Sequence, residues 1–303
     1  MALPYFLFFI ILLPYGYDAD LTYAQTRSQI QLENKNILIL NAFESNIPAF
    51  ERTNQGLSAA LQSGGIGIRN QFYEHLDLVR NPDSENRKLM TQLISKRYSE
   101  RNIDLIITLF PESLNFLLEM GPDFFSAAPV LALLLPQGFK LPETDRQIIS
   151  QPVTPDLKRT LEIGLKLVPK AERIYVVSGT HPLDRWLEKM VRKDSEKWKG
   201  RLDFRYMSGL PPAKILSTIS AAPAESIVFI TAYSQDVTGK YQTTVELSRQ
   251  IAQVSEAPVF GLLCTTLGNG IAGGSLISFK YIGTKAGEVT LDIIRGVKNT
   301  EDI

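Results

Sequence analysis

The sequence predicts an α/β protein of two doubly wound parallel-sheet lobes that are joined by a multi-strand hinge. Short apolar runs of strand length, such as residues 36–41 and 104–109, alternate with segments of helical spacing. That alternation is typical of parallel sheets that helices cover on both faces. The chain also breaks at a proline-rich stretch and at a glycine-rich one, and its 303 residues exceed the size of one small core. We therefore expect two lobes with a cleft between them.

The first series of strands and helices begins at residue 36. Its apolar runs have the length of strands, and the segments between them repeat apolar residues with helical spacing. Pro111 is expected in the first turn of a helix, where proline is tolerated. The expected strands are residues 36–41, 66–73, 104–109 and 129–135, and the expected helices are residues 48–61, 84–100 and a segment that begins at Pro111.

Residues 140–155 interrupt this pattern with three prolines and several polar residues. We interpret this stretch as the first connection between the lobes. A second series of strands and helices then begins. Its expected strands are residues 173–178, 202–206, 226–233 and 258–263, and its expected helices are residues 182–198, 212–220 and 243–254.

A glycine-rich segment follows the last of these strands. Gly268, Gly270 and Gly273 have the spacing G-x-G-x-x-G, which in dinucleotide-binding proteins opens a helix directly after a strand. Here the glycines lead into an expected strand at residues 275–279, so we expect a backbone crossover between the lobes instead. A helix at residues 281–296 would then return to the first lobe. The expected N-lobe is residues 35–145 plus 268–298, and the expected C-lobe is residues 153–264.

The N-terminus has the features of a signal peptide at residues 1–24. Residues 5–14 are continuously apolar, and Thr22 and Ala24 offer a small-x-small cleavage site before Gln25. The apolar run is too short to span a bilayer. We expect an exported chain that is periplasmic or extracytoplasmic, with an uncleaved membrane anchor as the alternative. The single cysteine, Cys264, cannot form an internal disulfide and gives no metal-ligand spacing.

Composition and motifs narrow the classes of function. Lys plus Arg and Asp plus Glu both number 32, and the pI is about 6.8. That balance disfavours nucleic acid as a partner, because nucleic-acid binders carry a basic footprint. The chain has no nucleophile elbow, phosphate-binding P-loop or zinc-binding HExxH motif. We therefore predict a non-enzymatic protein with no catalytic residue, no metal and no cofactor.

The loops that follow the expected strands supply the candidate binding residues, because ligands of open α/β sheets sit beyond the carboxyl ends of the strands. Aromatic rings there can hold an apolar or planar ligand, and hydroxyl, amide and carboxylate groups can orient it. The same residues could instead pack the hinge or form ordinary turns. The candidates are Phe43, Glu44, Phe110, Glu112, His181, Tyr233, Gln235, Asp236 and Thr265.

An enzyme is the alternative to a binding protein. A hydrolase or transferase would use the same cleft, with Asp236 or Glu112 as general base. Such an enzyme needs two titratable groups within mutual reach and with opposed pKa shifts, whereas a binding protein needs only a pocket that can close.

Three stretches of the sequence together resemble a bacterial family. They are residues 210–236, which end in VFITAYSQD, residues 257–261 (APVFG) and residues 268–274 (GNGIAGG). The chain is similar, over about residues 35–298, to the ABC-transporter substrate-binding-protein-like family of the type I periplasmic-binding fold. Within it, the chain most resembles the extracytoplasmic sensor regions of bacterial histidine kinases.

This resemblance implies a mechanism and a set of partners. Members of the family capture a small-molecule ligand by closing two lobes about a hinge. The positions that the resemblance carries over are Tyr233, Gln235 and Asp236 after a C-lobe strand, and the glycines of the crossover. The implied partner is a membrane transporter or a sensor kinase.

Overall fold

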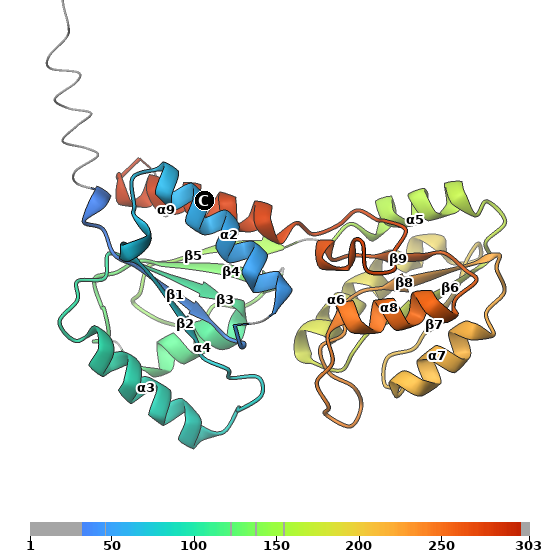
Figure 1. The fold of residues 1–303 in the computed structure, drawn as a ribbon, viewed down its shortest axis with the longest axis horizontal. Coiled ribbons are helices and arrows are strands. Elements are labelled where there is room, and N and C mark those ends of the chain that lie inside the picture. Colours follow the sequence, from blue (N-terminus) through green and yellow to red (C-terminus); the bar gives the residue numbers. More distant parts are fainter. Residues whose placement is uncertain (1–31, 46, 122, 137, 154, 298–303) are drawn as a thin grey trace, which may run out of the picture.

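The computed structural model describes residues 32–297 except residues 46, 122, 137 and 154. The chain forms two α/β lobes that lie side by side (Figure 1), as the sequence predicts. The expected signal peptide at residues 1–24 lies outside the described residues. Within the described part of the chain, no helix has the length and apolar character needed to cross a membrane.

The N-lobe is built on a five-stranded parallel sheet with the strand order β2-β1-β3-β4-β5. Every residue of β1 and of β3 is buried, which explains why these strands are apolar along their whole length. The strands are β1 (Ile37–Asn41), β2 (Gln71–His75), β3 (Leu105–Leu109), β4 (Val130–Pro136) and β5 (Ile148–Val153).

Helices cover both faces of this sheet. One face packs against α2 (Pro48–Ser63) and α9 (Phe279–Ile294), and the other face packs against α3 (Ser84–Tyr98) and α4 (Phe110–Glu119). The helix from the C-terminal part of the chain therefore completes the N-lobe.

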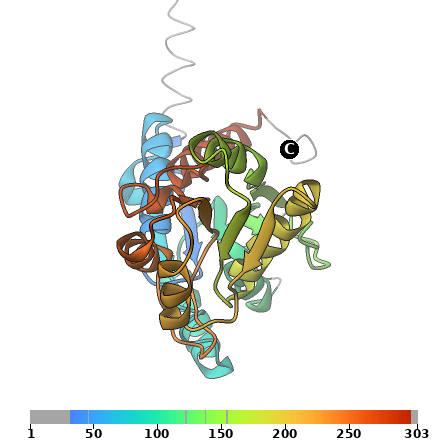
Figure 2. The same ribbon diagram turned by 90° about the vertical axis from the view of Figure 1, so that its right-hand side faces the viewer.

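The C-lobe has a four-stranded parallel sheet in the order β7-β6-β8-β9. Helices α5 (Leu157–Leu167) and α6 (Pro182–Ser195) pack on one face, and α7 (Pro212–Ser220) and α8 (Thr244–Val254) pack on the other. Figure 2 shows this lobe from its outer end, with helices around the sheet. The strands are β6 (Arg173–Val177), β7 (Asp203–Tyr206), β8 (Ser226–Ile230) and β9 (Val259–Gly261). Two short 3-10 helices of this part of the chain are η2 (Glu196–Trp198) and η3 (Cys264–Thr266), and a third, η1 (Ile68–Asn70), precedes β2 in the N-lobe.

The structure differs from the sequence prediction in three segments. Residues 140–155 were expected to connect the lobes, but they contain β5, which extends the N-lobe sheet beyond residue 145. Residues 66–73 begin as η1 and become strand only from Gln71. Residues 275–279 form no strand, because only an isolated bridge joins Ile277 to Leu263.

Within the described residues, the chain crosses between the lobes twice, once between β5 and α5 and once between η3 and α9. The second crossing lies further along the chain than the glycine-rich segment at residues 268–274, where the sequence predicted it. Residues 272–277 still hydrogen-bond along β9 and η3 in the C-lobe. Gly274 permits this close path, since its φ is +148° and a Cβ would overlap the carbonyl oxygen of Gly261. Arg52 of α2 donates to the Cys264 carbonyl oxygen at 3.3 Å and so ties the N-lobe to this segment.

Glycines also allow α2 and α9 to pack with their backbones almost in contact. A Cβ at Gly283 would overlap the Thr53 carbonyl oxygen, and a Cβ at Gly56 would overlap the Lys280 carbonyl oxygen. Gly287 lies against Ala60 one turn further along. The two helices lie side by side in Figure 1, and this packing holds the C-terminal helix on the N-lobe.

We expect Gly283→Ala to lower the free energy of unfolding by about 1–3 kcal/mol, because the added methyl group must push the two helices apart. Alanine's better helix propensity offsets only part of that loss. The matched control is Gly67→Ala, which has open space around it and an ordinary φ of −63°. Urea unfolding measures both variants, and a Gly283→Ala protein as stable as the control would contradict the packing argument.

Candidate ligand-binding cleft

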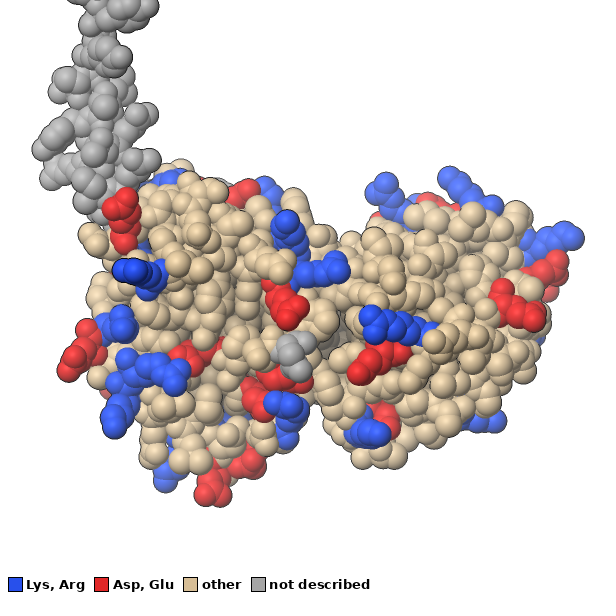
Figure 3. Space-filling model, viewed as in Figure 1, with Lys and Arg blue, Asp and Glu red and all other residues tan. Residues whose placement is uncertain are grey.

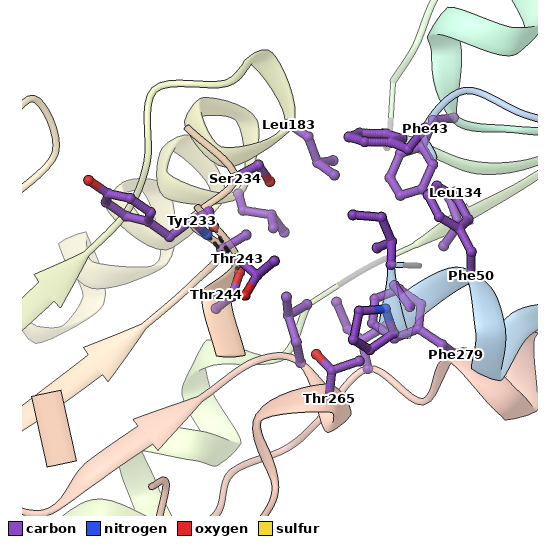
Figure 4. A pocket seen from close by; sticks show the side chains of 18 of the residues that line it. Phe43, Phe50, Leu134, Leu183, Tyr233, Ser234, Thr243, Thr244, Thr265 and Phe279 are labelled. Carbon is purple, nitrogen blue, oxygen red and sulfur yellow. Dashed lines mark hydrogen bonds between the residues drawn. The ribbon is translucent and has the colours of Figure 1, made fainter. Parts of the chain in front are cut away.

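The carboxyl ends of both sheets face a cleft between the lobes. Its unfilled space is about 850 Å³, part of which is open to solvent. Figure 4 shows side chains of the two lobes facing each other across it. None of the described lining residues is charged. They are Phe43, Ile47, Pro48, Ala49, Phe50, Phe110, Leu134, Val153, Leu183, Trp186, Leu187, Ala232, Tyr233, Ser234, Tyr241, Thr243, Thr244, Val245, Leu263, Thr265, Ile277 and Phe279.

A cluster of aromatic rings forms the N-lobe wall. Phe43 follows β1, Phe50 lies in the first turn of α2 and Phe110 follows β3. The ring centroid of Phe43 lies 5.3 Å from the centroid of Phe50 and also 5.3 Å from that of Phe110. The centroids of Phe50 and Phe110 are 5.5 Å apart. Two of these pairs are edge-to-face, which is a favourable arrangement of aromatic rings. The wall is therefore rigid and apolar.

Two residues of this wall have unusual backbone conformations. Phe110 and Leu134 have φ values of +73° and +58°, in the left-handed region that non-glycine residues rarely adopt. Each stands at the carboxyl end of a strand, and at Leu134 the pairing of β4 with β5 shifts register. Such strained residues cluster at functional sites. Here both line the cleft.

The C-lobe wall combines apolar side chains with hydroxyl groups. Leu183, Trp186 and Leu187 come from the first turns of α6. The hydroxyl-bearing residues Ser234, Thr243, Thr244 and Tyr241 come from the segment between β8 and α8, and Thr265 comes from η3. Proline at the first position of α6 and the capping box of α8, formed by Thr243 and Glu246, fix where these helices begin beside the cleft.

A buried carboxyl group holds the C-lobe wall together from behind. The Asp184 side chain is fully buried and accepts from the Ser234 backbone N–H at 2.8 Å and from the Ser234 hydroxyl at 3.0 Å. Burial raises the pKa of Asp184 to about 6, against the lowering effect of these hydrogen bonds. Asp184 thus fixes the loop after β8 to the start of α6.

His181 makes a contact between the lobes. Its ring centroid is 5.7 Å from that of Phe43, and its Nδ1 accepts from the Leu183 backbone N–H at 3.4 Å. His181 is 6% exposed, and burial lowers its pKa to about 4. The imidazole is therefore neutral at pH 7 and packs against the N-lobe wall.

Tyr233 contributes main chain rather than its ring to the cleft. Its side chain is 1% exposed and packs in the C-lobe core. Figure 4 shows the ring pointing away from the other lining residues. The Tyr233 backbone N–H donates to the Thr244 hydroxyl at 2.9 Å. The expectation of a cleft-facing phenol is therefore wrong, because the ring lies on the face of the sheet that α7 and α8 cover.

Gln235 and Asp236 organise their own loop. Asp236 Oδ1 accepts from the backbone N–H groups of Thr238 and Lys240 and from the Thr238 hydroxyl, and these bonds lower the pKa of Asp236. Gln235 donates from Nε2 to the Gly239 carbonyl oxygen at 2.9 Å. Neither residue is among the described residues that line the cleft.

The two candidate glutamates have different positions. Glu112, in the first turn of α4, is not among the described lining residues, and burial raises its pKa. Glu44 is 9% exposed and lies beside the cleft, next to the lining residues Phe43 and Tyr241. No group of three or more His, Cys, Asp or Glu that could hold a metal ion occurs in the described part of the chain.

Sequence reasoning missed most of the apolar lining. Phe50, Trp186 and Phe279 lie in the first turns of helices rather than in the loops after strands. Pro48 and Pro182 mark two of those helix starts, and a helix that follows a strand begins at the sheet edge where ligands bind. Those prolines were the signal that could have identified Phe50 and Trp186.

Comparisons with known proteins identify the fold. No family model matches the sequence, and no curated protein sequence is significantly similar. Among solved structures, the ligand-free, open structure of CD0873, a substrate binding protein with adhesive properties from Clostridium difficile, has a TM-score of 0.62 at 18% identity, covering 89% of this chain and 88% of that one. The ABC domain in complex with L-Trp from Streptococcus pneumonia has a TM-score of 0.57 at 13% identity, with coverages of 88% and 87%.

A third similar structure is the XylFII–LytSN complex, with a TM-score of 0.53 at 12% identity, covering 86% of this chain and 94% of that one. The three structural matches each extend over at least 86% of this chain and so cover both of its parallel-sheet lobes. The chain has a type I periplasmic-binding-protein-like fold, as its sequence predicts.

His181 and Asp184, two buried titratable groups at the start of α6, give opposite pH dependences of stability. A histidine with a lowered pKa loses stability as the pH falls from its ordinary 6.5 to about 4, whereas an aspartate with a raised pKa loses stability as the pH rises from 3.8 to about 6. We expect His181→Gln to remove the first effect, which reaches about 3 kcal/mol at pH 4. Urea unfolding between pH 7 and pH 4 tests this difference. Parallel pH profiles of wild type and variant would contradict it.

Proposed function

We propose that this chain is a non-enzymatic, extracytoplasmic small-molecule binding protein or sensor region, which captures its ligand between two lobes and signals to a transporter or a histidine kinase. The observation that carries the proposal is the inter-lobe cleft, whose described lining is apolar and aromatic and contains no charged side chain. Concave, largely apolar pockets with a few polar groups are the usual form of small-molecule sites.

The chemistry of the lining favours a ligand with an apolar or aromatic body. The rings of Phe43, Phe50 and Phe110 can pack against such a body on the N-lobe side. The hydroxyl of Thr265 can orient it through directed hydrogen bonds from the C-lobe side. A sugar, with hydroxyls around its whole ring, would leave most of them without partners in this cleft.

Ligand binding would act by shifting the lobes toward a closed arrangement. His181 already contacts Phe43 across the cleft, and Leu183 packs against the N-lobe core. A ligand that touches both walls binds the closed form more tightly than the open one, and the population shift can be no larger than that difference in affinity. The hinge for this motion consists of the two crossings, one between β5 and α5 and the other between η3 and α9.

The similar structures support a binding role and its setting. One is a substrate binding protein, one is a complex with L-Trp and one is a complex of XylFII with LytSN. The expected signal peptide adds support for an extracytoplasmic location. Transport and signalling remain two forms of the same proposal, since both use a ligand-dependent closure of the lobes.

The enzymatic alternative has no support from the described side chains. Its expected bases were Asp236 and Glu112, yet neither lines the cleft, and the Asp236 carboxylate is bound to its own loop. Asp184 has a raised pKa, but Ser234 occupies both of its oxygens. Turnover of a bound ligand by the purified protein would overturn the proposal and favour an enzyme.

The two tryptophans of the chain allow a direct test. Trp186 lines the cleft and Trp198 does not. We expect a small phenyl compound such as 2-phenylethanol to raise the melting temperature and to change tryptophan emission. The emission change should persist in Trp198→Phe and disappear in Trp186→Phe. An emission change that follows Trp198, or the absence of any stabilisation by apolar compounds, would place the site elsewhere.

A further inference from the structure

The carboxylate of Glu44 is buried beside the cleft and only partly satisfied. Its Oε2 atom is buried and has no hydrogen-bond partner among the described residues, where it is the one carboxylate oxygen in that state. The residue is 9% exposed. A buried acceptor without a partner lowers stability, and more so when it is charged. Such an atom therefore points to a donor that binds there.

Arg80 is the nearest cation, but it does not satisfy Glu44. Its Nε lies 3.8 Å from Glu44 Oε2, beyond hydrogen-bond distance. The same guanidinium forms two short bonds with Asp77, at 2.7 Å from Nε and 2.8 Å from Nη2. Asp77 thus balances the charge of Arg80, and the group of three side chains keeps one net negative charge.

Glu44 lies where the two lobes meet. It directly follows Phe43, whose ring lines the cleft. Across the cleft, the Tyr241 side chain has its pKa raised by burial first and then by the negative charge of Glu44. Tyr241 also lines the cleft. Glu44 is not itself a lining residue, but it is the neighbour in sequence of one lining residue and its charge acts on a second, so its carboxylate lies behind the edge of an otherwise uncharged site. In Figure 3, the face shown carries charges of both signs in a scattered pattern, with no broad patch of one sign on that face.

We propose that Glu44 binds a protonated amine of the ligand, and that the ligands of this cleft are small amines with an aromatic or aliphatic body. This inference rests on the proposed function, because it assumes that the cleft is the ligand site. The ammonium group donates to the free Glu44 oxygen while the apolar body packs against the phenylalanine cluster. A carboxylate on the same ligand is disfavoured, since none of the described lining residues offers a positive charge to it.

A matched series of three probes isolates the charge of the ligand from its shape. The probes are 2-phenylethylamine, 2-phenylethanol and phenylacetate, which share one ring and differ in the group at the end of a short chain. We expect the amine to bind at least about tenfold more tightly than the alcohol, because a hydrogen bond to a charged group contributes about 1.5–3 kcal/mol. Phenylacetate should bind most weakly. Isothermal titration calorimetry on the full protein measures all three.

The variant Glu44→Gln keeps the shape of the side chain and removes its charge. We expect it to lose most of the preference for the amine, with about a tenfold or greater drop in amine affinity and little change for the alcohol. Its melting temperature without ligand should not fall, since the variant removes a buried charge that lacks a full set of partners. The control is Glu119→Gln, an exposed glutamate at the end of α4 in the same lobe, which should leave all three affinities unchanged.

The possible results separate this inference from the proposed function. If the alcohol binds as tightly as the amine, and Glu44→Gln changes neither affinity, the proposal that Glu44 binds an amine is overturned. The cleft would then still be a site for apolar ligands. If phenylacetate binds most tightly, the charge preference is the reverse of the one proposed. If none of the three binds and no apolar compound changes Trp186 emission, both the inference and the proposed cleft function are overturned.

Discussion

The close packing of α9 against α2 is the contact on which the two-lobed arrangement depends. The chain enters the C-lobe after β5 and must return to the N-lobe to complete it, and α9 is the element that returns. Glycines on both helices let the backbones approach to a distance that any side chain would prevent. This contact fixes the end of the second crossing, and the two crossings together set the hinge and the width of the cleft.

The cleft is held in shape by groups behind its C-lobe wall and by the backbone of its N-lobe wall. Asp184 sits behind the C-lobe wall and fixes Ser234, while Asp236 keeps the neighbouring loop folded through three hydrogen bonds. On the other side, Phe110 and Leu134 adopt left-handed backbone conformations that the surrounding sheet must maintain. The buried strands of the two sheets supply the stability that these costly local arrangements require.

The sequence predicted the alternation of strands and helices well because buried parallel strands have a strong apolar signature. It did not predict β5, because the proline and polar residues of this segment are also typical of a connection between lobes. An edge strand can contain such residues, since it needs no continuous apolar run and not all of its backbone N–H groups pair with a neighbouring strand. Phe43, Phe110 and Thr265, which the sequence placed after strands, line the cleft, and their role in ligand binding stays a prediction. The same rule failed for Tyr233 and Asp236, because sequence position does not show whether a side chain faces the cleft, the core or its own loop. The polar side chains of residues 234–236 were expected to bind a ligand. In the structure, much of their hydrogen bonding is instead made within the lobe.

Both ends of the described chain belong to the same lobe. Leu32 lies in the N-lobe core, and α9 packs on that lobe (Figure 1). A tether or partner joined to either end would therefore hold the N-lobe in place. The C-lobe would then be the part that is free to rotate about the two crossings. Under the proposed closure, a small rotation at the crossings becomes a larger displacement at the far edge of β7. The larger change in position therefore falls on the surface of the C-lobe.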